Sequence, residues 1–196
     1  MACITLTKGR KLPCRGGKSG FRAVGFAVWE DGLITGTDGE VATLPVGLTD
    51  VYRYQLKNTG NTYSEEIASD AESRTVVYNG TLSIVLHNLD LATRNEIKML
   101  AMGELIIFVE TYNGDILVIG AGQGAELTGG TIAETGGAPS DFQGSKLTFS
   151  TSDNEPYLRL STSAERRLDG MIKGKMVYNF GVNIIRPNEV VWRKTV

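Results

Sequence analysis

Apolar side chains recur at every second position in four separate stretches of the chain, mostly with polar side chains between them. Successive side chains of a β-strand point to opposite faces, so this alternation is typical of strands with one buried and one polar face. The four stretches are Tyr52–Leu56, Leu82–Leu86, Leu147–Phe149 and Tyr178–Ile184. The pattern predicts a mainly β fold for this chain of 196 residues.

Four further stretches are more continuously apolar or β-branched, and we expect them to be strands buried on both faces. They are Phe21–Trp29, Thr75–Tyr78, Glu104–Thr111 and Asp115–Ile119. Asn113-Gly114 separates the last two, and Asn-Gly favours a type I′ hairpin turn. Asp31-Gly32 is a second turn signal. Asn79-Gly80 indicates either a third turn or a bulge within one long strand.

One segment, Asp90–Gly103, has the spacing of a helix instead. Asp90 can cap the free amides at its start, and Ile97, Leu100 and Ala101 fall on one face. Gly103 is placed for a left-handed C-terminal stop. We therefore expect one short helix of about three turns after the middle strands, packed on the sheet through one side.

The segment Gly120–Gly144 is rich in Gly, Thr, Ala and Ser and has little periodicity. We interpret it as loops around a short strand at Ala125–Thr128. Residues 153–176 have no clear period, apart from a helical turn expected at Ala164–Leu168. The chain contains 24 glycines, which is well above the usual ~7% and suits a fold with many tight turns.

The composition excludes several classes of protein. Twenty Lys and Arg stand against 22 Asp and Glu, a net charge of −2, so the chain has no general basic excess for binding nucleic acid. No apolar run approaches the ~18 residues that a membrane span needs. Two cysteines, Cys3 and Cys14, and one histidine, His87, are too few for a four-ligand zinc site of the Cys/His type or for a disulfide framework.

The first residues lack the apolar core and cleavage site of a signal peptide, so we expect the protein to be made and kept in a reducing cytoplasm. In that setting, Cys3 and Cys14 are interpreted as small buried side chains.

Two motifs suggest an enzyme, and both have simpler explanations. Gly120, Gly122 and Ala125 have the offsets of a dinucleotide fingerprint, but no helix signal follows them to hold a pyrophosphate. His87 ends a predicted strand, and the chain has no nucleophile-elbow sequence. We therefore expect no catalytic, cofactor-binding or metal-binding residues and no enzymatic activity.

Carboxylates gather within Asn61–Arg74, where no basic residue occurs before Arg74. They are Glu65, Glu66, Asp70 and Glu72. A solvated hairpin tip is the simpler interpretation. The sharper hypothesis is a surface that must not bind a polyanion, because like charge repels phosphate.

Segments in a fixed order along the chain carry a family likeness. They are Met1–Cys14, Val51–Lys57, Asn61–Glu65, Leu82–Asp90, the helix up to Met102, Phe108–Ile119 and Gly129–Phe149. Through them the chain resembles the small structural proteins of tailed bacteriophages that form tail tubes. The likeness covers about residues 1–160, and residues from about 160 onward depart from it.

The resemblance implies a tube-type β-sandwich or barrel flanked by one helix over residues 1–160, with residues 161–196 as a C-terminal extension packed on the same domain. Such proteins form rings, usually hexameric, that stack into a hollow tube in the virion tail, through which DNA leaves. The implied partners are further copies of the chain and other tail proteins, assembled in the cytoplasm of the host bacterium. DNA would pass through the lumen without specific binding, and neither a membrane nor a cofactor is implied.

On this reading, the acidic cluster Glu65, Glu66, Asp70 and Glu72 is a candidate lumen ring or ring–ring interface. The polar faces of two predicted strands are candidate lumen walls. They are Arg53, Gln55 and Lys57 on one strand and Ser83, Val85 and His87 on the other.

Three other functions stay open. A head–tail connector, a tail terminator or a capsid decoration protein would share a small, β-rich fold. A carbohydrate- or receptor-binding β-sandwich would need exposed aromatic side chains in a cleft. An enzyme is disfavoured by the scarcity of His and Cys.

Overall fold

The computed structural model describes residues 9–10, 17–48, 50–57, 59–162, 164–165, 168 and 172–173. Half of the structure is β-strand, and one short helix follows the middle strands, so the predicted mainly β fold is confirmed. Cys3, Cys14, the predicted strand Tyr178–Ile184 and most of the extension 161–196 lie outside the described residues.

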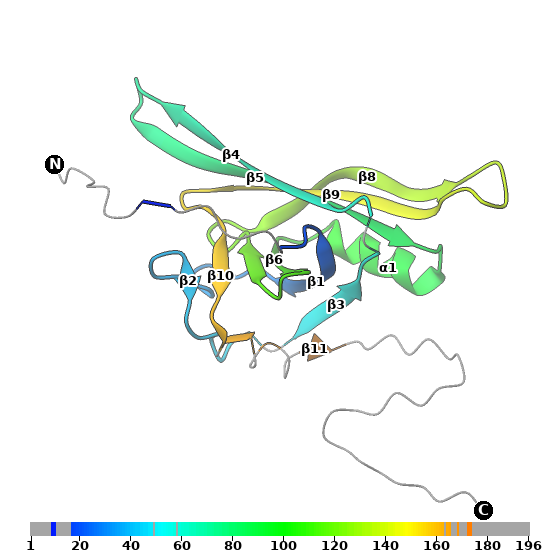
Figure 1. Ribbon diagram of the computed structural model, residues 1–196, viewed down its shortest axis with the longest axis horizontal. Helices are drawn as coiled ribbons and strands as arrows, with labels where there is room; N and C mark the ends of the chain where they lie inside the picture. Colours follow the sequence, from blue (N-terminus) through cyan, green and yellow to red (C-terminus); the bar gives the residue numbers. More distant parts are fainter. Residues whose placement is uncertain are drawn as a thin grey trace, which may run out of the picture.

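The strands form one mixed sheet whose two ends stay open (Figure 1). Its path runs β11-β3-β1-β6-β8-β9-β5-β4, and a branch leaves β6 through β7 and β10 to β2. In chain order, the elements are β1 (Phe21–Val28), β2 (Glu40–Val41), β3 (Val51–Gln55), β4 (Thr62–Asp70), β5 (Thr75–His87), α1 (Leu91–Leu100), β6 (Leu105–Thr111), β7 (Ile116–Ile119), β8 (Ala125–Thr135), β9 (Gln143–Asp153), β10 (Leu158–Leu160) and β11 (Ile172–Lys173).

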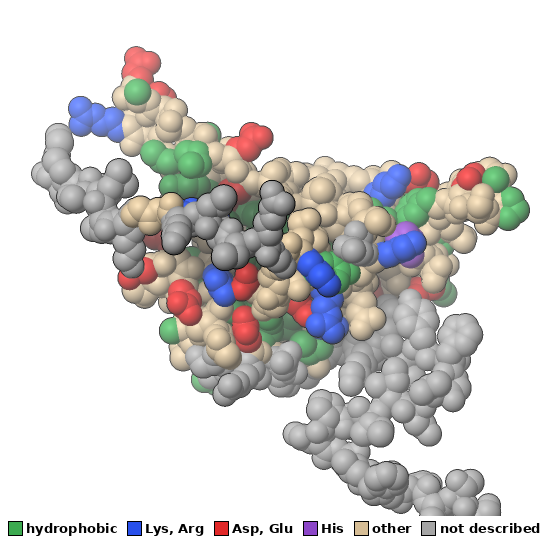
Figure 2. All heavy atoms as spheres, viewed as in Figure 1, with side chains coloured by type: hydrophobic (Ala, Val, Ile, Leu, Met, Phe, Trp, Pro, Cys, Tyr) green, Lys and Arg blue, Asp and Glu red, His purple; other side chains and the backbone are tan. Residues whose placement is uncertain are grey.

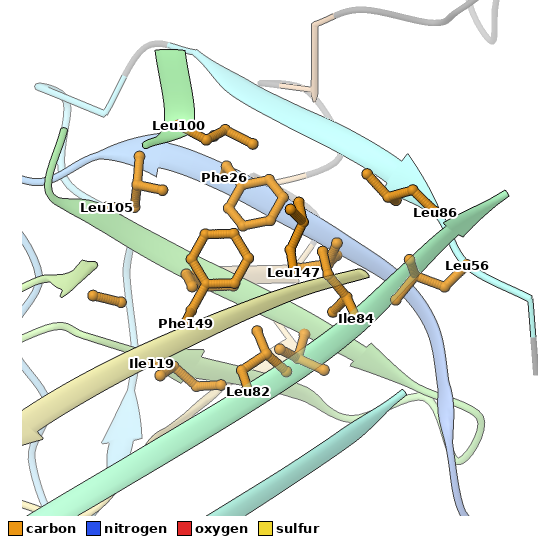
Figure 3. Close-up of a cluster of buried hydrophobic side chains, with 14 of the residues drawn as sticks. Phe26, Leu56, Leu82, Ile84, Leu86, Leu100, Leu105, Ile119, Leu147 and Phe149 are labelled. Carbon is orange, nitrogen blue, oxygen red and sulfur yellow. The ribbon is translucent and has the colours of Figure 1, made fainter. Parts of the chain in front are cut away.

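The sheet turns a corner between β6 and β8, which pair only through Leu105 and Ala125. Beyond this corner, β8, β9, β5 and β4 make up what we call the four-stranded half-sheet. A first hydrophobic core fills the space between this half-sheet and β1, β6 and β7 (Figure 3). Phe26 of β1 and Phe149 of β9 meet across it, with ring centroids 5.2 Å apart. The two halves of the sheet therefore face each other, as the layers of a sandwich do.

The alternation that predicted the central strands is confirmed by their burial. Leu82, Ile84 and Leu86 of β5 point into the first core, as do Leu147 and Phe149 of β9. In β3, Leu56 is buried just after the strand and Tyr54 packs against the same core. Tyr52 is 46% exposed, so the predicted buried face of β3 is incomplete.

A second core covers the opposite face of β1 and β6, which explains why these two strands are apolar on both faces. Ala27, Ile106 and Phe108 contribute to it from the strands, and Leu44 and Leu160 contribute from the covering segments. The predicted two-sided burial of these strands is confirmed. The predicted helical turn at Ala164–Leu168 lies partly outside the described residues, and the hydrogen bond from the N–H of Glu165 to the carbonyl of Ser161 (2.9 Å) closes a turn that begins before it.

The helix α1 begins as predicted and ends differently. The Asp90 carboxylate accepts a hydrogen bond from the N–H of Thr93, and Ile97 and Leu100 are buried in the first core. The predicted left-handed stop at Gly103 is wrong, because the helix ends at Ala101 with a right-handed φ of −77°. The N–H groups of Ala101 and Met102 bond to the last carbonyls, so no positive φ is needed.

The predicted hairpin at Asn113-Gly114 is confirmed, and its predicted turn type is wrong. The loop has three residues rather than two, since Thr111 and Asp115 pair through the N–H of Thr111 (2.9 Å). Gly114 has a positive φ of 90° and Asn113 does not, whereas a type I′ turn needs positive φ at both. The geometry is that of a type I turn followed by a left-handed glycine, which also matches the strand twist.

Asn79-Gly80 is neither a turn nor a bulge, because β5 continues through it with unbroken register to β4 and β9. Glycine is required there by a close approach: a Cβ on Gly80 would lie 2.7 Å from Cγ2 of Thr151. Upstream of this point, the predicted burial of Thr75–Tyr78 on both faces is wrong. This end of β5 extends past β9, whose last partner is Tyr78, so it carries only β4 beside it.

The interpretation of Gly120–Gly144 as loops around a short strand is wrong. Ala125–Thr135 is an eleven-residue strand, β8, which forms a long hairpin with β9. Two register shifts, between Leu127 and Gly129 and between Thr131 and Glu134, interrupt its pairing. Each shift inserts an extra residue and so erases the two-residue period that would have predicted the strand.

Replacing one of two isoleucines by alanine distinguishes the core from the exposed hairpin that β4 and β5 form beyond the end of β9. Ile84→Ala removes a side chain that is 0% exposed and should lower the free energy of unfolding by about 2–5 kcal/mol. Ile67→Ala, at a side chain that is 67% exposed, should change it by less than about 0.5 kcal/mol in the monomer. Urea denaturation at low protein concentration measures both. Equal losses would contradict the assignment of the core.

Candidate self-assembly surface

The four-stranded half-sheet is open along both sides. β4 ends the hydrogen-bonded path, and after Ala125 β8 has no described strand on the side away from β9. All three pairings within the half-sheet are antiparallel, so β4 and β8 run in opposite directions. Edge strands carry unpaired N–H and C=O groups that can pair with another chain. When two copies have the same orientation, β4 of one copy can therefore pair antiparallel with β8 of the other.

The hydrogen bonds identify which residues of β4 face the open edge. The N–H of Val85 points toward β4, since it donates to the carboxamide oxygen of Asn61 (2.9 Å). Alternate residues of β5 face the same way, so β5 pairs with Thr62, Ser64, Glu66 and Ala68. The residues between them direct their main-chain groups outward. They are Tyr63, Glu65, Ile67 and Ser69.

The face of the half-sheet that points away from the core is covered by short polar side chains; we call this face the polar wall. It carries the residues that alternate with the core positions of each strand. On β5 and β9, these include Thr81, Ser83, Thr148, Ser150 and Ser152. Figure 2 shows this face in profile, along the upper margin between the two long hairpins, where few side chains are charged. The predicted wall at Ser83, Val85 and His87 lies on this face.

The polar wall is weakly acidic. Glu66, Asp70, Glu126 and Glu134 lie on it by register, against one lysine, Lys146. The Lys146 ammonium is 2.7 Å from Oε2 of Glu134, so its charge is locally neutralised. The wall thus offers a polyanion no unpaired lysine or arginine among the residues placed on it.

The other predicted wall does not belong to this surface. Arg53 lies in β3, on the other half of the sheet, and pairs with Glu110 at 2.6 Å. Arg22 shares the same carboxylate at 3.3 Å. Gln55 and Lys57 are exposed at the end of the same segment. Arg53, Gln55 and Lys57 therefore cannot line one continuous wall with Ser83.

The four predicted acidic residues lie on different faces of the hairpin. Glu66 and Asp70 lie on the polar wall, Glu65 lies on the opposite face of β4, and Glu72 lies in the turn after the strand. The predicted hairpin tip is confirmed as residues 71–74. Alternation along β4 is the reason for the separation, because Glu65 and Glu66 are neighbours in sequence.

Glu65 fixes the base of the projecting hairpin. Its Oε1 accepts hydrogen bonds from the Tyr63 hydroxyl (3.2 Å) and from the N–H of Tyr157 (3.0 Å). The rings of Tyr63 and Tyr157 also meet edge to face, with centroids 6.3 Å apart. Glu65 thus holds the loop before β10 against β4. The sequence did not indicate this role.

The two motifs that suggested an enzyme lie at the ends of strands β7 and β5. Gly120 is followed by a turn and then by β8, so no helix follows the glycines. The ring of His87 packs edge to face on Phe142, with centroids 5.2 Å apart. No group of three His, Cys, Asp or Glu side chains among the described residues could hold a metal ion.

No family model, curated protein or solved structure matches the chain. In the part of the chain that the structure describes, no helix is long and apolar enough to cross a membrane.

The tyrosines at the first core should make stability depend on pH in the alkaline range. Burial, reinforced by the Glu65 carboxylate, raises the pKa of Tyr63 well above its usual range, and burial and Glu96 raise the pKa of Tyr54 to about 12. Unfolding returns both phenols to about 10. Above that pH, the unfolded chain loses protons that the folded chain keeps, so stability falls as pH rises.

We therefore expect the free energy of unfolding to decrease from about pH 10 upward, and the decrease to be shallower in Tyr63→Phe. Urea denaturation over a series of alkaline buffers measures the slope. Identical slopes for the two proteins would show that Tyr63 is not the group responsible.

Proposed function

We propose that this chain is the tube subunit of a bacteriophage tail, which forms rings that stack into a hollow tube for the passage of DNA. The observation that carries the proposal is the four-stranded half-sheet, open at β4 and at β8 and covered on its outer face by short polar side chains. The ordered likeness to tail tube proteins supports the same function.

Ring closure follows from the two open edges. In the register of the half-sheet, Thr62–Glu65 lie level with Ala125–Gly129, so the nine residues of β4 and the eleven of β8 overlap over most of their length only when the neighbouring copy is also shifted along the strands. Two copies related by a rotation about an axis inclined to the strands, as in a β-barrel, have this shift and bring the two edges together in antiparallel orientation. Such head-to-tail contacts close when the rotation divides a full turn, and closure leaves no free edge.

The polar wall would then line the channel. DNA carries one negative charge per ~1.7 Å of helix axis, and unpaired lysine or arginine side chains would hold it. The wall carries short hydroxyl side chains, and its Lys146 is paired with Glu134. A surface of this kind lets DNA slide without specific binding, and no catalytic residue, cofactor or membrane takes part. The partners are further copies of the chain and other tail proteins, in a virion assembled in the host cytoplasm.

Another ring-forming virion protein, such as a head–tail connector, a tail terminator or a decoration protein, is the second candidate. The open edges favour it as much as they favour a tube subunit. Light scattering of the purified full chain gives the mass of the assembly, and negative-stain microscopy gives its form. Stacked tubes support the tube subunit, single rings support the second candidate, and monomers at all concentrations contradict both.

A matched pair of proline substitutions tests the edge. Ser69→Pro removes an N–H that points outward from β4, so the hairpin should keep its stability while ring formation weakens. The lost hydrogen bond weakens each interface by about 1 kcal/mol, which lowers the association constant about fivefold. A clash between the proline side chain and the neighbouring strand would lower it further. Ala68→Pro removes an N–H that bonds to β5 and should destabilise the hairpin itself. Size-exclusion chromatography and thermal unfolding separate the two effects. Unchanged assembly of Ser69→Pro would contradict pairing at this edge.

Added charge tests the wall. The double variant Thr81→Lys with Thr148→Lys places two cations on the polar wall, and its assemblies should bind a short fluorescent DNA duplex that wild-type assemblies do not bind. The control, Val28→Lys with Val46→Lys, adds the same charge at side chains that are 70% and 83% exposed elsewhere. Fluorescence anisotropy measures binding. Equal binding by both variants would place the wall outside the channel.

A further inference from the structure

The β4–β5 hairpin projects beyond the rest of the sheet as two strands only. β9 reaches no further along β5 than Tyr78, so residues 68–77 have no third strand (Figure 1). One face of this projection is apolar and exposed: Ile67 is 67% exposed and Val76 is 47% exposed, beside the half-buried Tyr78. We call these three residues the apolar stripe. Figure 2 shows apolar side chains gathered on this hairpin, with acidic side chains toward its tip.

A groove with matching chemistry lies at the opposite end of the half-sheet. It has a volume of about 290 Å³ between the start of α1 and the β8–β9 hairpin. Leu89, Leu91 and Ile132 line it, with exposures of 37%, 70% and 54%, and Arg94 lies on its rim. We call it the helix groove. Large exposed apolar side chains gathered around a hollow are typical of contact sites.

The charges of the two regions are opposite. Asp70 and Glu72 lie at the tip of the hairpin, beside Arg74. Arg94 and Lys98 are exposed on α1 and form no ion pair with any residue the structure describes. Asp90 at the groove is engaged in capping the helix. Complementary charge of this kind fixes the orientation of a contact.

The placement of stripe and groove makes one contact between two copies geometrically simple. Both lie on the core-facing side of the half-sheet, since Ile67 and Val76 alternate in register with Leu82, and Ser145 in the groove points to the core side. They lie at the two ends of β5, whose 13 residues span about 40 Å. A second copy displaced along the strands, without rotation of the sheet, therefore brings the end that holds its groove next to the hairpin that holds the stripe of the first.

We infer that the acid-tipped apolar stripe of one copy docks in the helix groove of a second copy and thereby joins successive rings. This inference rests on the proposed function and names the contact that stacks the rings. Two different surfaces of the same chain meet, so the contact is heterologous and propagates without limit along one direction. Ring closure through β4 and β8 uses main-chain groups instead and is independent of it.

Photo-crosslinking of the full chain tests the contact directly. p-Benzoylphenylalanine replaces Ile67, the assembled protein is irradiated, and the joined peptides are identified by mass spectrometry. We expect intermolecular crosslinks to residues 88–94 or to Ile132. The same probe at Val46, which is exposed elsewhere, should not reach these residues. Tubes whose crosslinks from position 67 map to other residues would overturn the inference and leave the proposed function intact. Monomers only would overturn both.

A charge exchange provides a second test that does not depend on the probe. Arg94→Glu lies in the first turns of α1, where a carboxylate favours the helix, so the variant should fold. Arg94→Glu or Glu72→Lys alone should raise the protein concentration needed for stacking about two- to fivefold, as the loss of a rim ion pair does. Both substitutions together should restore it, whereas Arg94→Glu with Glu126→Lys, on the polar wall, should not. Unchanged stacking in both single variants would overturn the inference, and ring size should stay constant throughout.

Discussion

Unpaired main-chain groups at the two edges of the four-stranded half-sheet are the constraint on which the rest of this molecule depends. The half-sheet cannot roll into a closed barrel to hide them, because its inner face is held by Phe149 and Ile84 in the first core. In the other half of the sheet, most of the long strands have a neighbour on each side: β11 lies beside β3, and β7 is followed by β10 and β2. Among the described strands, β11 and β2 also have an open side but are two residues long, whereas β4 and the greater part of β8 are long strands with a neighbour on one side only. A long open edge on a stable sheet favours pairing with another chain.

The sequence predicted the strands that are held by the core and missed those that are not. Leu82–Leu86 and Leu147–Phe149 alternate because each has one face in the core, and β1 is apolar throughout because each of its faces packs on a core. β8 has hardly any buried side chains after Ala125 and two register shifts, so no period survives in its sequence. Composition could not distinguish the projecting Thr75–Tyr78 from a buried strand, because β-branched residues suit both.

The alternation of side chains along a strand also explains why the acidic cluster was predicted only in part. The four acidic residues were predicted as one feature, and strand alternation places Glu65 on the face opposite Glu66. That separation follows from the sequence once β4 is known to be a strand. The role of Glu65 at the base of the hairpin depends on Tyr157, 92 residues further along the chain, and no local pattern could predict it.

The outer face of the half-sheet carries fewer long charged side chains than an ordinary solvated sheet face does. Exposed antiparallel strands commonly carry long charged side chains, whereas β5 and β9 carry Thr81, Ser83, Thr148 and Ser150 there, and Lys146 is paired with Glu134. Long flexible side chains would hold a polyanion and narrow a channel, and short hydroxyls do neither. The requirement for solubility alone does not select such side chains, since lysine and glutamate satisfy it equally well. Repeated around a closed ring, the same face would present a smooth wall of low charge, and this is the property that passage of DNA demands of a channel.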